Sequence, residues 1–85
     1  MEEKLVGKIT HYFTNIGVAV VEITKGKLKT GDKLHIKGST SDFEQVIDSM
    51  QVEHENVETA KKGDAVGLKV DQQVREGDEV NLISK

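Results

Sequence analysis

The most informative part of this sequence is Gly26-Lys27-Leu28-Lys29-Thr30-Gly31-Asp32-Lys33-Leu34-His35-Ile36-Lys37-Gly38. It contains a Gly-Asp pair that is followed by apolar residues at every second position. The same arrangement occurs twice more, after Gly63-Asp64 and after Gly77-Asp78. Glycine readily adopts the positive φ that tight turns need, and an aspartate side chain hydrogen-bonds to nearby backbone. Each pair therefore predicts a turn that leads into a strand with one buried face.

Six segments of the chain have the alternation or the β-branched composition of strands, and turn residues separate them. They are residues 3–13, 18–23, 33–37, 43–53, 64–70 and 79–83. Short strands in this number predict an all-β fold, a small closed antiparallel barrel of about six strands, because closure removes the exposed edges. Leu28 is expected in a connector, and residues 55–62 are expected to hold one helical turn, with Asn56 as its cap.

The inward faces of the first and fourth strands follow from the alternation. In the first strand we expect Leu5, Ile9 and Phe13 to face the core, and Phe43 is expected there as well. Neither face of residues 43–53 is purely apolar. In this strand the inward set is expected to be Val46, Met50 and Val52.

Length and composition restrict the function classes. The 85 residues form one domain, residues 1–85 with a core of about 4–84, and a chain of this size has a small core. There is no cysteine, so disulfides and thiolate metal sites are excluded. The sequence has no apolar run of membrane-spanning length and no signal-like region. We therefore predict a cytoplasmic protein that binds no membrane.

The charges are unevenly distributed although the net charge is only −3. Residues 42–58 are acidic and contain neither lysine nor arginine, whereas residues 25–37 are basic. Alternate lysines in an extended segment meet successive phosphates, and an exposed aromatic ring stacks on bases. The predicted nucleic-acid-binding residues are Lys25, Lys27, Lys29, Lys33, Lys37 and Tyr12. The alternative is that these lysines form an ordinary solvated surface.

Five phrases in order resemble the second, β-barrel domain of translational GTPases such as elongation factor Tu. They are Val6-Gly7-Lys8-Ile9, residues 17–23 with 26–36, Val46 to Met50, Val57-x-x-Ala60-x-x-Gly63-Asp64-x-Val66-Gly67-Leu68, and Val74-Arg75-Glu76-Gly77-Asp78-x-Val80. The resemblance covers about residues 5–83. The chain has none of the guanine-nucleotide motifs that belong to the GTPase domain of these factors. It is thus similar to stand-alone elongation-factor-like proteins of prokaryotes.

The resemblance implies a non-catalytic, translation-associated module that binds tRNA, ribosomal RNA or the ribosome, and no nucleotide. The alternative is a protein–protein adaptor or accessory subunit that docks through the barrel surface, with the acidic stretch 42–58 as one face for a basic partner. No enzyme, cofactor or metal site is expected. The cluster Ser39, Thr40, Ser41 has no positioned base beside it, and Glu53 and Glu55 point away from His54 on an alternating strand.

Overall fold

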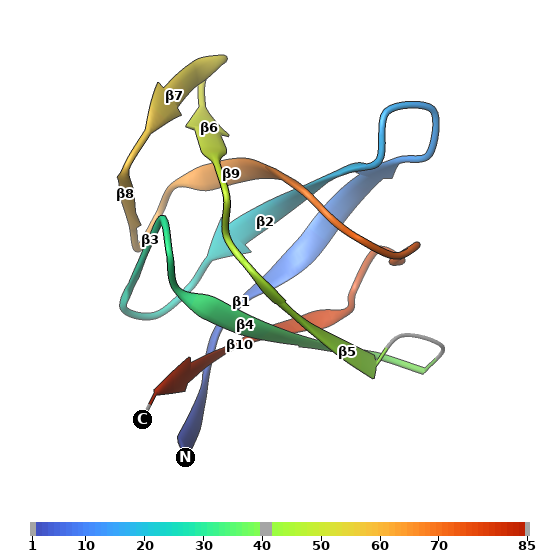
Figure 1. Ribbon diagram of the computed structural model, residues 1–85, viewed down its shortest axis with the longest axis horizontal. Coiled ribbons are helices and arrows are strands. Elements are labelled where there is room, and N and C mark those ends of the chain that lie inside the picture. Colours follow the sequence, from blue (N-terminus) through green and yellow to red (C-terminus); the bar gives the residue numbers. More distant parts are fainter. Residues whose placement is uncertain (1, 40–41, 85) are drawn as a thin grey trace.

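The computed structural model describes residues 2–39 and 42–84, and every regular element in them is a strand. The strands are β1 (Glu2–Phe13), β2 (Val18–Ile23), β3 (Lys27–Lys29), β4 (Lys33–Lys37), β5 (Asp42–Val46), β6 (Met50–Val52), β7 (Glu55–Val57), β8 (Thr59–Lys61), β9 (Ala65–Lys69) and β10 (Glu79–Ser84) (Figure 1). Eight of them form an antiparallel sheet in the order β5-β4-β10-β1-β2-β9-β6-β7, and β3 pairs with β8. The all-β prediction is confirmed.

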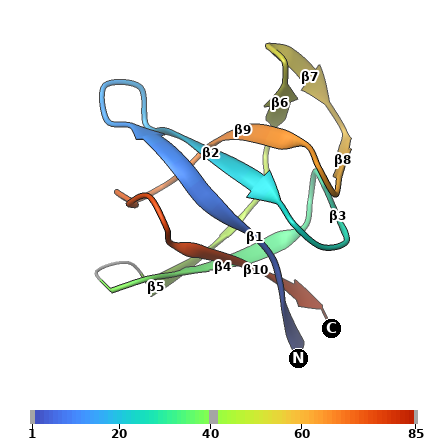
Figure 2. The same cartoon turned by 180° about the vertical axis from the view of Figure 1, so that it is seen from behind.

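The sheet curls into a barrel because β5 and β6, which follow one another in the chain, lie near its two opposite ends. β5 pairs with β4 and β6 pairs with β9, and residues 47–49 join the two strands. The backbone of Ile47 is fixed by two hydrogen bonds, from its N–H to the Asp32 carbonyl at 2.9 Å and from the Gly31 N–H to its carbonyl at 2.8 Å. Seen from behind, β1, β2 and β9 form the opposite wall (Figure 2).

A buried amide closes the gap between β5 and the end of β9. The Gln45 side chain is 6% exposed, and its Nε2 donates to the Lys69 carbonyl at 2.8 Å. Its Oε1 accepts a hydrogen bond from the Asp71 N–H at 2.9 Å. One side chain thus provides the donor and the acceptor that a neighbouring strand would provide.

The three Gly-Asp pairs form the same hydrogen-bonded turn. Gly31, Gly63 and Gly77 have φ of 93°, 96° and 91°. In each turn the aspartate Oδ2 accepts a hydrogen bond of 3.0 Å from the backbone N–H three residues earlier. The aspartate N–H donates back to the carbonyl of that same earlier residue. The predicted turn chemistry is therefore confirmed, and the turns lead into β4, β9 and β10.

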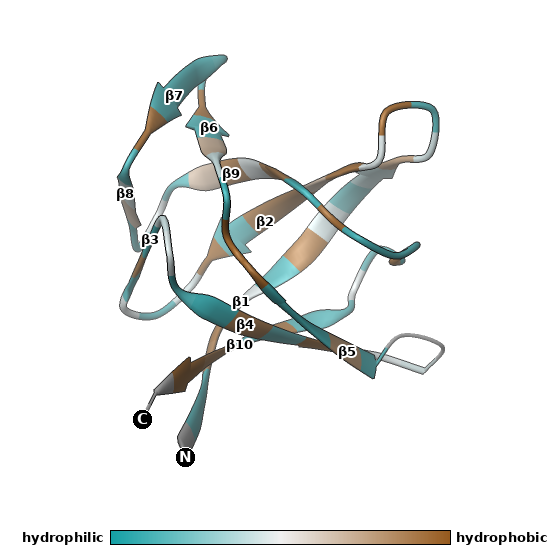
Figure 3. Cartoon of the chain, viewed as in Figure 1, coloured by the Kyte–Doolittle hydropathy of each residue, from teal (hydrophilic) through white to brown (hydrophobic). Residues whose placement is uncertain are grey.

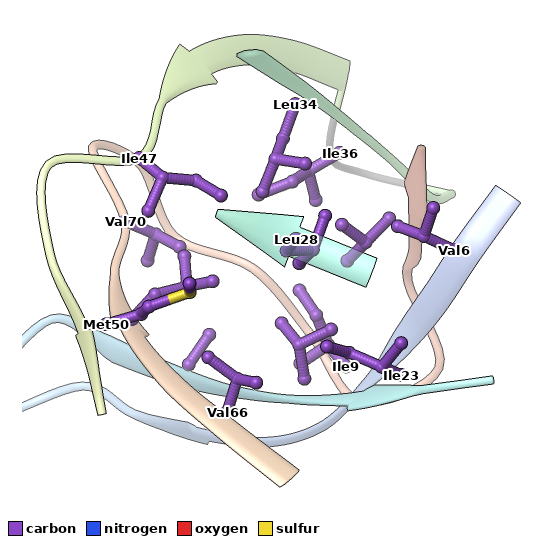
Figure 4. Packing of buried hydrophobic residues seen from close by; sticks show 14 of the residues in the cluster. Val6, Ile9, Ile23, Leu28, Leu34, Ile36, Ile47, Met50, Val66 and Val70 are labelled. Atoms are coloured by element: carbon purple, nitrogen blue, oxygen red, sulfur yellow. The ribbon is translucent and has the colours of Figure 1, made fainter. Parts of the chain in front are cut away.

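The core is a single cluster of apolar side chains that point to the barrel axis (Figure 4). Most strands alternate between hydrophobic and hydrophilic residues along their length, as the colour changes in Figure 3 show. The buried residues are Val6, Ile9, Ala19, Val21, Ile23, Leu28, Leu34, Ile36, Phe43, Ile47, Met50, Ala60, Val66, Leu68, Val70, Val74 and Val80. Leu28 is fully buried in β3, so its prediction as a connector residue is wrong.

The inward face predicted for the first strand is partly wrong because β1 contains two irregularities. Its register with β10 shifts between Leu5 and Gly7, and its register with β2 shifts between Ile9 and His11. An extra residue in a strand moves the following side chains to the other face. Ile9 is buried as expected, but Leu5 is 39% exposed and Phe13 is 50% exposed.

Two predictions for residues 43–62 are also wrong. Val46 is 50% exposed because the inward positions of β5 are Phe43 and Gln45. The inward positions shift by one residue between β5 and β6, so that Met50 is buried. A polar residue at an inward position hides the alternation from sequence reasoning. The helical turn expected in residues 55–62 is absent, and β7 and β8 occupy this region.

Among residues 2–39 and 42–84, no helix has the length and apolar character needed to cross a membrane. The cytoplasmic location stays a prediction.

Candidate functional site

The first half of β1 has one edge without a strand partner. β1 pairs with β10 over residues 2–8, but its pairing with β2 begins only at Gly7. On this second edge the N–H groups of Thr24 and Lys25 both donate to the Val6 carbonyl, at 2.8 and 3.1 Å. Beyond this point the two segments separate. The edge of residues 2–5 therefore faces a gap, at the end of the barrel where the chain begins and ends (Figures 1 and 2).

A groove of about 520 Å³ follows this open edge, and we call it the β1-edge groove. Its apolar part consists of Leu5 and Val6 from β1 and Leu82 from β10. Val6 is buried, whereas Leu82 is partly buried against the core and Leu5 is exposed. The remaining lining residues are Lys4, Lys25, Gly26 and Lys27. The groove thus combines an apolar floor with three ammonium groups.

Two further lysines extend this positive charge. Lys27 lies directly opposite Lys61 in the β3–β8 pairing, and the Lys62 N–H donates to the Gly26 carbonyl at 3.0 Å. Like charges opposite one another on paired strands destabilise the pairing. In the described part of the chain, no carboxylate forms a salt bridge with these lysines or with the groove lysines. We call Lys4, Lys25, Lys27, Lys61 and Lys62 the basic rim.

The structure separates the six residues predicted to bind nucleic acid. Only Lys25 and Lys27 line the groove. Lys29 is exposed in β3, Lys33 Nζ lies 3.0 Å from Glu44 Oε1, and Lys37 is exposed at the far end of β4. Tyr12 is half-buried and packs against the core. Their role in nucleic-acid binding stays a prediction.

Sequence reasoning missed three of the basic-rim lysines, Lys4, Lys61 and Lys62. Lys4 lies in the first predicted strand, and Lys61 and Lys62 precede the second Gly-Asp turn. They approach Lys25 and Lys27 only through the pairing of β3 with β8 and the path of β1. The sequence shows no periodic signal for this gathering.

A second, smaller groove of about 300 Å³ lies on the outer face of β1, β2 and β9. Its apolar lining includes the exposed Phe13 and Ile16. At its border is the two-residue turn between β6 and β7, in which Glu53 and His54 have φ of 53° and 66°. Positive φ at both positions normally requires asparagine or glycine. Among the described side chains, no group of three histidines or carboxylates is arranged to hold a metal.

His35 connects three strands on the outer face of the sheet. Its Nδ1 lies 2.6 Å from Glu3 Oε1 and its Nε2 lies 2.5 Å from Asp42 Oδ1, and the ring is 15% exposed. Both ring nitrogens donate only when the imidazole is protonated. The hydrogen bonds to Asp42 and then to Glu3 raise the pKa of His35, and the His35 bond lowers the pKa of Asp42. Through Glu3 the cluster ties the start of β1, beside the groove, to β4 and β5.

Replacing His35 by glutamine is expected to reduce stability mainly at mildly acidic pH. The raised pKa of His35 means that its contribution is complete below the unfolded value of 6.5 and is lost as the pH rises through the folded value. The lowered pKa of Asp42 means that its contribution is present above 3.8 and is lost as the pH falls further. At pH 5.5 we expect a difference in the free energy of unfolding of at most about 1 kcal/mol, because the carboxylates are exposed and screened.

Urea unfolding at pH 5.5 and pH 8.5 measures this difference, and it should shrink at the higher pH. The control is His11→Gln, because His11 and Glu76 are 3.6 Å apart and both are about two-thirds exposed. A gap between the parent and His35→Gln that is equal at both pH values would show that the cluster carries no proton-linked stability.

Comparison with known proteins gives both a family and a functional context. Residues 17–72 match the family described as elongation factor Tu domain 2. An uncharacterized protease from Methanocaldococcus jannaschii is 41% identical over 81 residues, 94% of this chain. A collagenase from Porphyromonas gingivalis is 34% identical over 85 residues, 99% of this chain. The chain spans only 20% and 24% of the length of these two curated relatives.

The fold also occurs in a solved structure. The C-terminal domain of a Geobacillus thermoleovorans protein classed as a U32 peptidase has a TM-score of 0.88 and 20% sequence identity. The match covers 95% of this chain and 93% of that domain. At this identity the likeness describes the fold alone.

These findings correct the predicted function. The relatives that match nearly the whole chain are named proteases and collagenases, so the expectation of a translation-associated module that binds tRNA, ribosomal RNA or the ribosome is wrong. One barrel fold serves unrelated functions, because function resides in the surface residues and not in the fold. With residues 17–72 matched, the chain belongs to the elongation factor Tu domain 2 family of barrels.

Proposed function

We propose that this chain is the accessory domain of a U32-type peptidase, and that it binds polypeptide for a catalytic part located elsewhere. The observation that carries the proposal is the 41% identity with a protease over 94% of the chain, in a match that covers only a fifth of that protease. A segment of this size leaves the larger part of such a relative for catalysis.

The surface of the barrel supports this role. The β1-edge groove is lined by lysines and apolar side chains, and the second groove is lined partly by exposed apolar side chains. Such surfaces bind partners through burial of apolar area and charge complementarity. A cleft with an open strand edge also suits an extended chain, which is the form in which peptidases receive their substrates.

The test uses the Porphyromonas gingivalis collagenase with its matching segment removed. We expect the KM for fluorescein-labelled gelatin to rise about tenfold, while kcat/KM for a short fluorogenic peptide stays unchanged, because the lost binding is remote from the reacting bond. Inserting this 85-residue chain in place of the segment should restore the KM for gelatin.

Thermal unfolding of the shortened collagenase shows whether its remaining part is folded. A folded, shortened enzyme that cleaves gelatin with the parent KM would rule out an accessory binding role. The same conclusion would follow if the inserted chain restored nothing although the hybrid was folded.

A further inference from the structure

We propose that the β1-edge groove binds an extended, acidic polypeptide segment, which adds to the open edge of β1 as an extra strand. This inference rests on the proposed function, since it names the chemistry of the polypeptide and the place where it binds. Three features of the groove support it: the backbone edge, the apolar floor and the basic rim.

The backbone edge is available because β2 pairs with β1 only from Gly7 onward. Over residues 2–5 it pairs with β10 on one side, while the side that β2 occupies later in the strand is open. Successive residues of a central strand direct their N–H and C=O groups to alternate sides. An added strand would lie about 4.8 Å from β1 and satisfy the groups on this side.

The floor of the groove fits apolar side chains of such a strand. Leu82 lies on the inner face of the sheet, opposite Lys4, and is only partly buried, whereas Leu5 lies on the outer face and is 39% exposed. A strand on this edge presents alternate side chains to one face. Apolar side chains on the inner face of the added strand would cover Leu82, whereas the intervening side chains would lie on the opposite face, with Leu5 and the exposed Lys25 and Lys27.

The basic rim selects the charge of the segment. Lys4, Lys25 and Lys27 line the groove, and Lys27 faces Lys61 across the β3–β8 pair. The lysine–lysine pairing is unfavourable in the free protein and is relieved by an anionic neighbour. By contrast, Lys33 already has Glu44 as its partner. Carboxylates at alternate positions of the bound segment would pair with Lys25 and Lys27, which themselves alternate in sequence.

The apolar floor and the open backbone edge favour a polypeptide over a nucleic acid. Single-stranded nucleic acids bind through phosphate contacts and base stacking on aromatic side chains. The lining of this groove has lysines but no aromatic residue. RNA binding at the same lysines is therefore the competing outcome, and the experiment must distinguish it from peptide binding.

The experiment measures fluorescence anisotropy of a fluorescein-labelled peptide, Leu-Asp-Val-Glu-Val-Asp-Leu, with the 85-residue chain. Three matched probes accompany it: the same peptide with lysine at the acidic positions, the peptide N-methylated at alternate residues, and a twelve-nucleotide RNA. We expect the acidic peptide to bind at least about tenfold more tightly than each of the other probes, because each lacks the charge, the backbone donors or the apolar side chains.

Two triple variants locate the site on the protein. The groove variant is Lys4→Gln, Lys25→Gln and Lys27→Gln, and the control variant is Lys37→Gln, Lys69→Gln and Arg75→Gln, all exposed and outside the groove. Both lose three positive charges. We expect the affinity for the acidic peptide to fall about tenfold in the groove variant and by less than about twofold in the control. Backbone amide shifts in NMR spectra should change at Lys4, Leu5 and Gly26.

Several outcomes would overturn the inference. These are equal losses in the two variants, unchanged binding of the N-methylated peptide, or tighter binding of the RNA than of the acidic peptide. Its failure is distinguishable from failure of the proposed function. If the hybrid collagenase binds gelatin normally with the groove variant inserted, the accessory role remains and only the groove assignment is wrong.

Discussion

Replacing Gly7 by alanine is expected to lower the free energy of unfolding by about 3 kcal/mol or more, because overpacking against backbone is hard to relieve. A Cβ atom at this position would lie 2.3 Å from the Glu22 carbonyl oxygen and 3.1 Å from Val21 Cγ1. Glu22 is fixed on both sides, by Lys8 of β1 and by Ala65 of β9. The strands must therefore separate at the point where the pairing of β1 with β2 begins. Urea unfolding followed by circular dichroism measures the loss.

The control for this substitution is Gly67→Ala in β9. The nearest atoms to a Cβ at Gly67 are Val18 Cγ1 at 3.8 Å and the Gln51 carbonyl oxygen at 3.9 Å, which are ordinary contacts. We expect a change within about 0.5 kcal/mol, as for surface substitutions without a special contact. Similar losses for both glycines would mean that crowding at Gly7 does not control stability.

Replacing Gln45 by leucine is expected to lower the free energy of unfolding by about 1–3 kcal/mol, since each of the two lost hydrogen bonds contributes about 0.5–1.5 kcal/mol. Leucine keeps much of the buried volume but leaves the Lys69 carbonyl and the Asp71 N–H without their partner. These groups lie at the gap between β5 and β9, where no ladder of backbone hydrogen bonds joins the two strands. Hydrogen exchange of the Asp71 amide should accelerate together with the loss of stability.

Gln45→Glu separates the hydrogen bonds from the shape of the side chain. A carboxylate still accepts from the Asp71 N–H but cannot donate to the Lys69 carbonyl, whereas a protonated carboxyl group can do both. The stability of this variant relative to the parent should therefore recover as the pH falls from 7 to about 4. A pH-independent loss equal to that of Gln45→Leu would show that the hydrogen bonds at this gap are not the cause.

The sequence predicted an element correctly where the contacts that form it join near neighbours in the chain. Each Gly-Asp turn is closed by hydrogen bonds between residues three apart, so a short motif contains all of its partners. The strand that follows each turn is likewise defined by its own alternation. These repeated local features predicted the all-β class, and the match of residues 17–72 shows the membership in the elongation factor Tu domain 2 family.

The predicted strand faces were wrong where the alternation of a strand depends on a partner far away in the chain. The alternation in the first strand breaks because β10 and β2 impose different registers on β1. The alternation in β5 is hidden because its inward Gln45 finds its hydrogen-bond partners 24 and 26 residues away. Family resemblance identified the barrel correctly, but it carried over the function of other members, which the peptidase relatives contradict.

The amino-acid sequence alone therefore established the turns, most of the strands and the all-β class, because near neighbours in the chain create them. The tertiary structure established the β1-edge groove, since β1, β10 and the pairing of β3 with β8 come together there from distant parts of the chain. Lys27 and Lys61 are 34 positions apart in the chain and yet directly opposite in space. Long-range strand pairing places these charges together, and no local pattern of residues records that pairing.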